Sequence, residues 1–290
     1  MADQHSMSSV GFAGIGAMGL PMALRLHDAG YEVLCLDPAE SRLREAERLG
    51  MATTGDVDYL ASCDTVVVMV ANAQQLESLL DSRLTDESSV VRTVVVCSTV
   101  GPHAMREIAS RLAEHGKSTI DLAVTGGVGG AVAGSLTLFA AGDPRLIESL
   151  KPMLAVFGRV RNGGARPGDG QSVKLVNNLL TAVNLVTVAE ALKFATASGL
   201  NRAEVLDLIS DGGAASWMLH DRGPRMALAP EERGLNTFTT VFAKDTVLID
   251  EVATESGADV PLLRIARRSF ERALERGWAE KDDSCIVDLD

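Results

Sequence analysis

Hydrophobic positions in the first half of the chain form short runs rich in β-branched residues, and these runs alternate with segments of helical spacing. Their apolarity is continuous rather than alternating, as expected for strands that are buried on both faces. The segments between them carry apolar residues three and four positions apart, and two of them open with proline. This alternation predicts a mostly parallel sheet covered by helices and built from βαβ units. The expected strands cover residues 10–13, 32–36, 65–70, 93–97, 119–124 and 136–140.

The pattern changes at residues 162–168, a glycine-rich stretch that we expect to be a flexible connection. Residues 170–198 contain no proline and no interior glycine, and Gly199 follows them at a favourable C-cap position. They predict one helix on the order of 40 Å long. We therefore expect a Rossmann-type doubly wound domain over residues 1–167 and an all-α domain over 168–290, joined by this helix. Further expected helices cover residues 202–210, 239–256 and 261–276.

Length and charge agree with this organisation and exclude some partners. A chain of 290 residues exceeds a comfortable single core, so two domains are the natural expectation. The formal net charge of −12 argues against nucleic acid or an anionic membrane as partner. It leaves room for an anionic substrate, because a local basic pocket can exist in an acidic protein.

Targeting and metal signals are weak. The longest apolar runs are too short to span a bilayer, and residues 1–8 lack the apolar core of a signal peptide, so we expect a frayed tail there. The four cysteines show neither C-x-x-C nor metal-ligand spacing. We expect reduced thiols, no metal site and a cytoplasmic location; the cysteines are Cys35, Cys63, Cys97 and Cys285.

A glycine pattern after the first apolar run predicts a dinucleotide site. Gly14, Gly16 and Gly19 form a G-x-G-x-x-G sequence between a predicted strand and a predicted helix. The first glycine allows a tight turn, the second lets the backbone approach a pyrophosphate, and the third lets the helix pack closely on the strand. The helix N-terminus then offers N–H groups and a partial positive charge to phosphates.

An acid follows the next predicted strand at the spacing that this fingerprint requires. Asp37 lies about 20 residues beyond the glycines, where a carboxylate hydrogen-bonds the ribose hydroxyls and repels a 2′-phosphate. That favours NAD over NADP. The alternative is that Asp37 and Pro38 merely open a turn and cap the following helix.

Polar residues cluster in the first turns of the long predicted helix. Lys174 and Asn178 are four positions apart and share a face, and Asn177 adjoins them among apolar neighbours. A lysine and two amides are costly to bury unless a partner satisfies them. From spacing alone, a lysine that reaches solvent and asparagines that bind neighbouring backbone remain an equal alternative.

Taken in order, these motifs resemble the β-hydroxyacid dehydrogenase family, which includes 3-hydroxyisobutyrate dehydrogenase and tartronate semialdehyde reductase. The resemblance extends from Val10 to about Val287 and implies the same two-domain architecture. Departures are Thr125, where the family usually has serine, and Leu122, where proline or alanine is common. The resemblance rests on the glycine sequence extended to residue 23, and on residues 98–102, 121–127 with their continuation to 136, 170–178 and 242–245.

The resemblance also implies roles for individual residues. Lys174 would be the catalytic lysine and Asn178 would hold the hydroxyl and carboxylate region of the substrate. Ser98 and Thr99 would lie near the nicotinamide, and Lys244, oriented by Asp245, would reach the cofactor from the second domain. The substrate carboxylate would be bound by Thr125, Gly126 and Gly127. The residues that would bind NAD are Gly14, Ile15, Gly16, Ala17, Met18, Asp37, Val70, Ala71, Ser98, Thr99 and Lys244.

The implied chemistry is hydride transfer from a carbinol carbon to NAD, coupled to removal of the hydroxyl proton. A free lysine has a pKa near 10.4, and burial or neighbouring positive charge must lower the pKa of a lysine that acts as a base near neutrality. A protonated lysine would instead donate a hydrogen bond to the developing alkoxide while water relays the proton. The sequence leaves both roles open for Lys174.

Within the family, the chain is most similar to the L-threonate dehydrogenase type, so a four-carbon sugar acid is the leading substrate. That similarity lies in residues 216–226 and 277–284. The alternatives are 3-hydroxyisobutyrate, and tartronate semialdehyde or glycerate. Imine reduction is disfavoured because Lys174 is present, and a decarboxylating sugar-phosphate dehydrogenase because the chain lacks its extra length. A non-catalytic NAD-binding module is the alternative from another class. The long helix suggests a homodimer or homotetramer.

Overall fold

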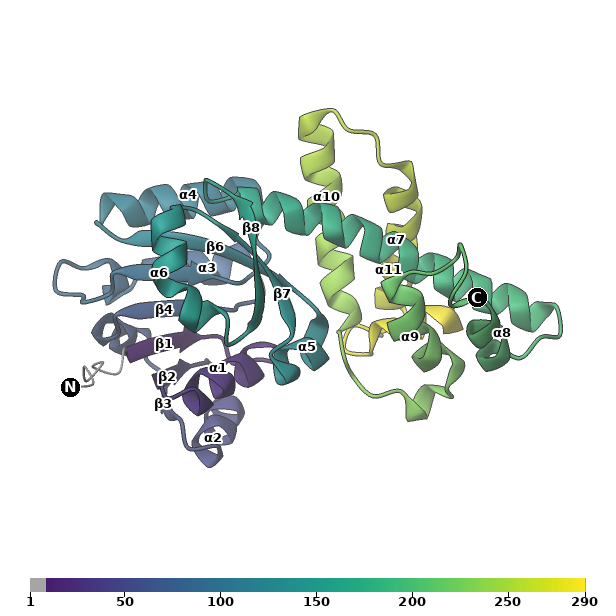
Figure 1. The fold of residues 1–290 in the computed structure, drawn as a ribbon, viewed down its shortest axis with the longest axis horizontal. Helices are drawn as coiled ribbons and strands as arrows, with labels where there is room; N and C mark the ends of the chain where they lie inside the picture. Colours follow the sequence, from purple (N-terminus) through teal and green to yellow (C-terminus); the bar gives the residue numbers. More distant parts are fainter. Residues whose placement is uncertain (1–8, 290) are drawn as a thin grey trace. The chain divides into compact units, whose positions relative to one another are not determined.

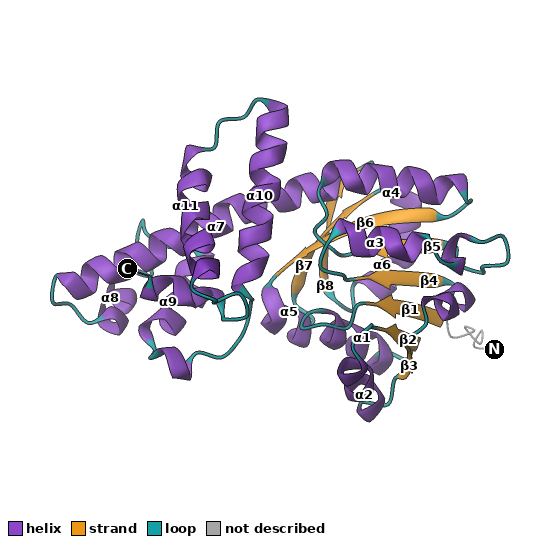
Figure 2. Ribbon diagram, turned by 180° about the vertical axis from the view of Figure 1, so that it is seen from behind, coloured by secondary structure: helices purple, strands orange, loops and turns teal. Residues whose placement is uncertain are grey.

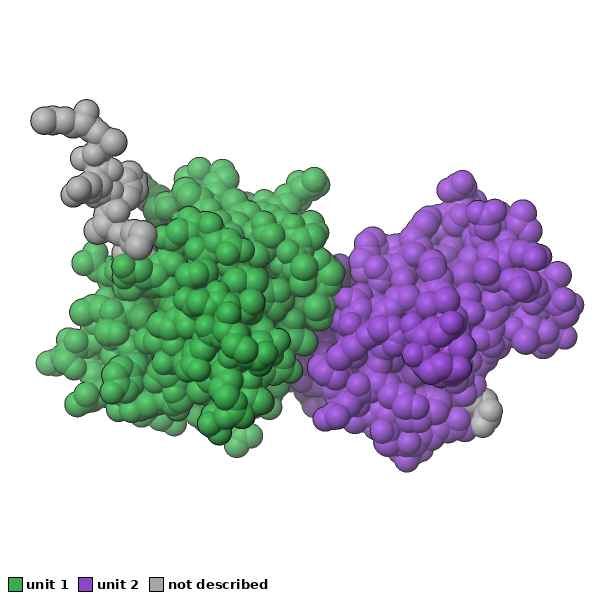
Figure 3. Space-filling model, turned by 90° about the horizontal axis from the view of Figure 1, so that it is seen from below, with its two compact units in different colours: residues 1–174 green, residues 175–290 purple. Residues whose placement is uncertain are grey.

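The computed structural model describes residues 9–289, so the frayed tail expected at residues 1–8 lies outside the described residues. The chain divides into two compact units, residues 1–174 and residues 175–290 (Figure 3). This division falls inside the long helix, whereas the boundary expected from sequence, at 167/168, falls just before it.

The first unit contains an eight-stranded sheet in the order β3-β2-β1-β4-β5-β6-β7-β8 (Figure 1). Its pairs are parallel except for β6 with β7, which confirms the predicted mostly parallel, doubly wound sheet. The strands are β1 (Ser9–Ala13), β2 (Glu32–Leu36), β3 (Ala52–Thr54), β4 (Thr65–Val68), β5 (Thr93–Val96), β6 (Ser118–Thr125), β7 (Leu136–Ala141) and β8 (Gly158–Gly164).

Helices cover both faces of this sheet (Figure 2). On β4 and β5 the valines divide between two hydrophobic clusters, one on each face. Val67 and Val95 belong to the cluster that includes residues of α1, α5 and α6, whereas their neighbours pack with α3 and α4. Burial on both faces explains the continuous apolar runs. The helices are α1 (Gly19–Asp28), α2 (Glu40–Arg48), α3 (Ala73–Leu80), α4 (Pro102–Glu114), α5 (Gly127–Ala133) and α6 (Pro144–Leu154).

The expected flexible connection at residues 162–168 is wrong in its first part, because residues 158–164 form the edge strand β8. Three of its seven residues, Arg159, Arg161 and Asn162, are exposed and polar, so the strand lacks the apolar signal of the central strands. Gly163 also made the strand difficult to predict, because glycine is more typical of loops. In the structure an added Cβ at Gly163 would lie 3.2 Å from the backbone of Phe139 on β7. Glycine therefore permits close pairing at a position where sequence reasoning expects a loop.

The second unit is helical, as predicted, and the described residues add only one isolated bridge between Phe238 and Asp282. The long helix α7 runs from Asp169 to Ala197 and begins within the first unit, which confirms the single helix expected there. The sequence did not predict α9, which contains Gly223 and Pro224. The other helices are α8 (Arg202–Ile209), α9 (Trp217–Ala227), α10 (Thr239–Ser256) and α11 (Pro261–Glu275), and a 3-10 helix covers Asp283–Asp288.

Among the described residues, α7 alone is long and apolar enough to cross a membrane by length and composition. Nevertheless 44% of its most apolar window is buried in protein, and the helix carries Lys174, Glu190 and Lys193. A core helix passes the same test, so this feature gives only weak support for a membrane span.

A buried charge cluster fixes the C-terminal segment to α9. The guanidinium of Arg222, 3% exposed, donates to both carboxylate oxygens of the fully buried Asp283 at 2.7 and 2.9 Å, and it also pairs with Asp221. Burial disfavours the charge of Arg222, but these two carboxylates outweigh it and raise its pKa. Arg225 pairs likewise with Asp282. These five residues belong to the segments that suggested the threonate type, and they pair mainly with one another.

The turn from β1 into α1 shows why two of its glycines are needed. Gly14 has a φ of 89°, and its amide donates to Leu36 O at 2.8 Å. An added Cβ at Gly19 would lie 1.9 Å from the carbonyl oxygen of Gly14, so only glycine lets α1 approach β1 this closely. An added Cβ at Gly16 would meet no atom within 4 Å. The open side of the turn is therefore at Gly16.

This geometry predicts opposite effects of alanine at two neighbouring glycines. Gly19→Ala should lower the free energy of unfolding by about 1–3 kcal/mol, because the turn must open to admit the methyl group. Gly16→Ala should change it by less than about 0.5 kcal/mol, since that position is open. Urea denaturation of both variants measures the difference. Equal stability losses would contradict the assigned packing.

Candidate active site

The carboxylate of Asp37 ties the glycine turn to the end of β2. Its Oδ2 accepts a hydrogen bond from the Ile15 amide at 3.0 Å, and its Oδ1 accepts from the Ala39 amide at 2.9 Å. The second bond, accepted from the backbone two residues further on, is the kind expected if Asp37 opens a turn. A carboxylate has about four acceptor sites, so Asp37 retains capacity for ribose hydroxyls beside the turn.

The other residues expected near the cofactor follow the ends of β4 and β5. Val70 and Ala71 come after β4, and Ser98 and Thr99 come after β5. Ser98 is buried, and its Oγ accepts a hydrogen bond from the Val70 amide at 2.7 Å. Because β1, β2, β4 and β5 are parallel neighbours, their carboxyl ends lie at one edge of the sheet. The structure thus brings these residues to the same edge as the glycine turn.

The residues expected to bind the substrate carboxylate stand at the end of β6, which is parallel to β5. Thr125 is the last residue of β6, and α5 begins two residues later at Gly127. Leu122, the other departure from the family pattern, is fully buried in the core of the first unit. The core of the first unit therefore accommodates a side chain larger than the proline or alanine that is common in the family.

Lys174 lies in the second turn of α7 and is 9% exposed. The start of this helix is held by two buried polar residues, Asp121 of β6 and Gln171 of α7, both 0% exposed. Asp121 Oδ2 accepts from the backbone amides of Gly168 and Gln171 at 2.9 and 3.0 Å. The Gln171 side chain in turn binds the backbone after β5. These contacts fix the turn that precedes Lys174.

In the second unit, Asn178 connects α7 with α10. Its Nδ2 donates to Asp245 Oδ2 at 2.6 Å, and its Oδ1 accepts from the side chain of Asn177 at 3.0 Å. The amine of Lys244 lies 3.2 Å from Asp245 Oδ1. Asp245, 1% exposed, therefore holds both the amide of Asn178 and the ammonium group of Lys244. The sequence suggested only the second of these contacts.

Sequence reasoning missed the roles of Asp121 and Gln171, although both stand in motifs that it identified. A usable signal was present, because Asp121 is the only charged residue in an otherwise apolar strand run from 119 to 124. A buried carboxylate requires hydrogen-bond donors. Local spacing does not reveal that the donors come from residues 168 and 171.

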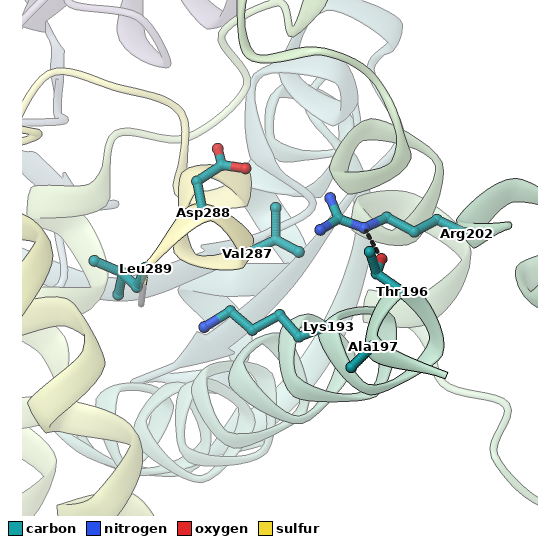
Figure 4. Close-up of a pocket in the computed structure, with 7 residues that line it drawn as sticks. All are labelled: Lys193, Thr196, Ala197, Arg202, Val287, Asp288 and Leu289. Carbon is teal, nitrogen blue, oxygen red and sulfur yellow. Dashed lines mark hydrogen bonds between the residues drawn. The ribbon is translucent and has the colours of Figure 1, made fainter. Parts of the chain in front are cut away.

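One surface hollow, drawn in Figure 4, lies away from all of these residues. Two of its charged side chains are already engaged: the guanidinium of Arg202 donates to Thr196 Oγ1 at 2.9 Å, and Asp288 pairs with Arg233. We do not assign the site there. It is lined by Lys193, Thr196, Ala197, Arg202, Val287, Asp288 and Leu289.

The residues present in the first unit fit a dinucleotide. The open space at Gly16 admits a pyrophosphate to the backbone, and α1 begins three residues later, at Gly19, without a side-chain cap on its N-terminal amides. Asp37 stands beside the same turn at the end of β2. Within the described residues, no group of three or more His, Cys, Asp or Glu side chains could hold a metal ion.

Comparison with known proteins agrees with this geometry. Residues 9–166 match the NAD-binding domain of 6-phosphogluconate dehydrogenase, and residues 168–289 match the NAD-binding domain of NADP-dependent 3-hydroxyisobutyrate dehydrogenase. The chain is 30% identical to an NAD-dependent L-serine dehydrogenase of Pseudomonas aeruginosa, with 98% of each chain covered. It is also 30% identical to an L-threonate dehydrogenase of Cupriavidus necator, covering 97% of this chain and 95% of that one.

A solved structure extends the similarity to the whole fold. The crystal structure of 3-hydroxyisobutyrate dehydrogenase from Salmonella typhimurium matches with a TM-score of 0.86 at 26% identity, covering 97% of this chain and 99% of that one. Sequence similarity and fold thus agree over nearly the whole of the described chain. The chain belongs to the β-hydroxyacid dehydrogenase family and is an NAD-binding oxidoreductase that acts on the CH–OH group of a hydroxy acid.

Proposed function

We propose that this protein oxidises a small 3-hydroxy acid with NAD, and that Lys174 handles the proton of the substrate hydroxyl. The observation that carries the proposal is the burial of Lys174, which is 9% exposed and stands on a helix turn that is fixed to β6 and to the backbone after β5. No histidine stands in the motifs at this edge of the sheet. Lys174 is therefore the residue suited to proton transfer.

NAD would be held by the glycine turn, by Asp37 and by the segments after β4 and β5, with Lys244 as a further contact. When bound, NAD supplies the nicotinamide that accepts a hydride from the carbinol carbon. The backbone amides at the start of α1 would bind its phosphates. The remaining task of the chain is to hold the substrate and to move one proton.

Lys174 can perform that task in two ways. Burial favours the neutral form of an amine, which accepts the hydroxyl proton as a base. A protonated amine would instead donate a hydrogen bond to the alkoxide as it develops, while water removes the proton. In both cases the amine lies at the substrate hydroxyl, and Asn178, one turn further along α7, would bind the same region of the substrate.

A four-carbon sugar acid such as threonate is the substrate that we favour. The support is the resemblance of residues 216–226 and 277–284 to the threonate type, together with the L-threonate dehydrogenases among its relatives. Thr125, Gly126 and Gly127 would bind the carboxylate. The methyl group of Thr125 would narrow the pocket beside it, where the family usually has serine. The three-carbon acid glycerate and the branched acid 3-hydroxyisobutyrate are the alternatives.

We further propose a cytoplasmic homodimer or homotetramer. Apolar side chains are exposed at helical spacing along α7, among them Val176 at 65%, Leu180 at 57% and Phe194 at 74%. A second copy of the chain would cover such a stripe and remove it from water. The four cysteines are free and buried, as suits a reducing compartment.

A panel of hydroxy acids with three to six carbons, assayed by the absorbance of NADH, tests the proposed function. The expected result is turnover with L-threonate or a related sugar acid in preference to 3-hydroxyisobutyrate, glycerate and L-serine. NAD binding without turnover on any acid would favour a non-catalytic module instead.

Lys174→Ala should lower kcat by at least about a hundredfold, because the proton transfer loses the amine proposed to assist it. The dissociation constant of NAD should stay within about twofold, which fluorescence titration measures. Lys193→Ala, on the same helix but outside the site, is the matched control and should retain wild-type turnover. Turnover retained by Lys174→Ala would end the assignment of this lysine.

Asp37→Ala should reduce the ratio of kcat/KM for NAD to that for NADP by at least about tenfold, because the carboxylate no longer repels a 2′-phosphate. Asp37→Asn separates charge from shape, since its amide oxygen can still accept from a backbone N–H. Asp37→Asn should also lower the preference for NAD over NADP, but it should decrease the free energy of unfolding less than Asp37→Ala does. If both variants keep the wild-type ratio, Asp37 serves only the turn.

A further inference from the structure

A carboxylate with no access to water anchors the start of α7. Asp121 is 0% exposed and lies within β6, where burial raises the pKa of its carboxyl and hydrogen bonds from Gln171 and Gly168 counter that effect. Its Oδ2 binds two backbone amides of the helix start, at residues 168 and 171. An added Cβ at Gly170 would lie 2.9 Å from this oxygen, so glycine at that position lets the carboxylate approach. Asp121 thus caps α7 from a strand 47 residues away.

Gln171 uses the full hydrogen-bonding capacity of its side chain. Its Oε1 accepts from the amides of Val100 and Gly101 at 2.9 and 3.1 Å. Its Nε2 donates to Ser98 O at 3.1 Å and to Asp121 Oδ1 at 3.0 Å. Only this orientation of the amide satisfies all four partners. The network therefore specifies the direction of Gln171, and every hydrogen bond that it makes to Asp121 is one that a carboxylate accepts.

The network joins three segments that carry candidate site residues. It binds the backbone after β5, where Ser98 and Thr99 stand, and the strand β6, which ends at Thr125. It also fixes the first turn of α7. Lys174 follows Gln171 by three residues, so the two side chains lie on neighbouring parts of one helix face. A rotation of this turn would carry the lysine with it.

We propose that Asp121 and Gln171 are positioning residues for the amine of Lys174. A carboxylate at the N-terminus of a helix interacts favourably with the amides that lack helical partners. Here that interaction sets the rotation and height of α7 relative to β5 and β6. A misplacement of about 1 Å at a reacting group can cost about a hundredfold in rate. This inference rests on the proposed role of Lys174.

A swap of acid and amide between the two positions tests the inference. Asp121→Asn places an NH2 group against the Nε2 of Gln171, so two donors meet. Gln171→Glu places a carboxylate oxygen against Asp121, so two anions meet. The double variant Asp121→Asn/Gln171→Glu restores one hydrogen bond with its direction reversed, and only Ser98 O loses its donor.

Each single variant should lower kcat by about tenfold or more, and the double variant should recover at least about fivefold over the weaker single variant. The dissociation constant of NAD should remain within about twofold in all three. Thr119→Val is the matched control on the same strand, because Thr119 Oγ1 is buried and has no hydrogen-bond partner among the described residues. It should keep wild-type kcat.

Hydrogen exchange over residues 166–174 gives a readout that does not depend on turnover. Exchange should accelerate in the single variants and slow again in the double variant. A general loss of structure would instead weaken NAD binding and accelerate exchange across the whole unit. The acid panel defines the substrate for the kinetic assays.

Folded single variants with kcat within twofold of wild type would overturn the proposal. A double variant whose loss of kcat equals the combined losses of the two single variants would overturn it too. Where a single variant does not fold, Gln171→Asn replaces it, because the shorter amide keeps its chemistry but no longer reaches residues 100 and 101. Unchanged kcat in that variant also overturns the proposal. Turnover retained by Lys174→Ala would refute the proposed function of the lysine. If Lys174→Ala loses turnover while the Asp121 and Gln171 variants keep it, only the positioning role is refuted.

Discussion

The buried carboxylate of Asp121 imposes the constraint on which this site depends. Removed from water, it is stable as an anion only while backbone and side-chain N–H groups surround it. Those groups come from the first turn of α7, and Gln171 passes the constraint on to the backbone after β5. One desolvated charge thereby determines where a long helix begins relative to a sheet. The position of Lys174 follows from that determination.

A second buried carboxylate has a similar role after β2. Asp37 binds the Ile15 amide and so holds the glycine turn against the end of β2. Gly14 and Gly19 let that turn be tight, and Gly16 leaves its outer side open. In the second unit, the carboxylate of Asp245 organises Asn178 and Lys244 in a similar way. Buried carboxylates that accept N–H donors thus organise three parts of the candidate site.

The sequence predicts what depends on local order. The glycine fingerprint, the acid after β2, the central strands and the 29-residue helix α7 all follow from residues that are close in the chain. The edge strands and α9 were missed, because short polar strands and a helix containing Gly223 and Pro224 carry no local signal. The contacts of Asp121 and Asn178 were missed for another reason. Their partners are 47 to 67 residues distant, and only the folded chain brings them together.

A crystal structure of the protein with NAD and a hydroxy acid tests the central claim most directly. The account predicts that the amine of Lys174 lies about 3 Å from the substrate hydroxyl oxygen, while Asp121 and Gln171 keep their hydrogen bonds to the start of α7. An amine that points into bulk solvent, away from the carbinol and the nicotinamide, would contradict it.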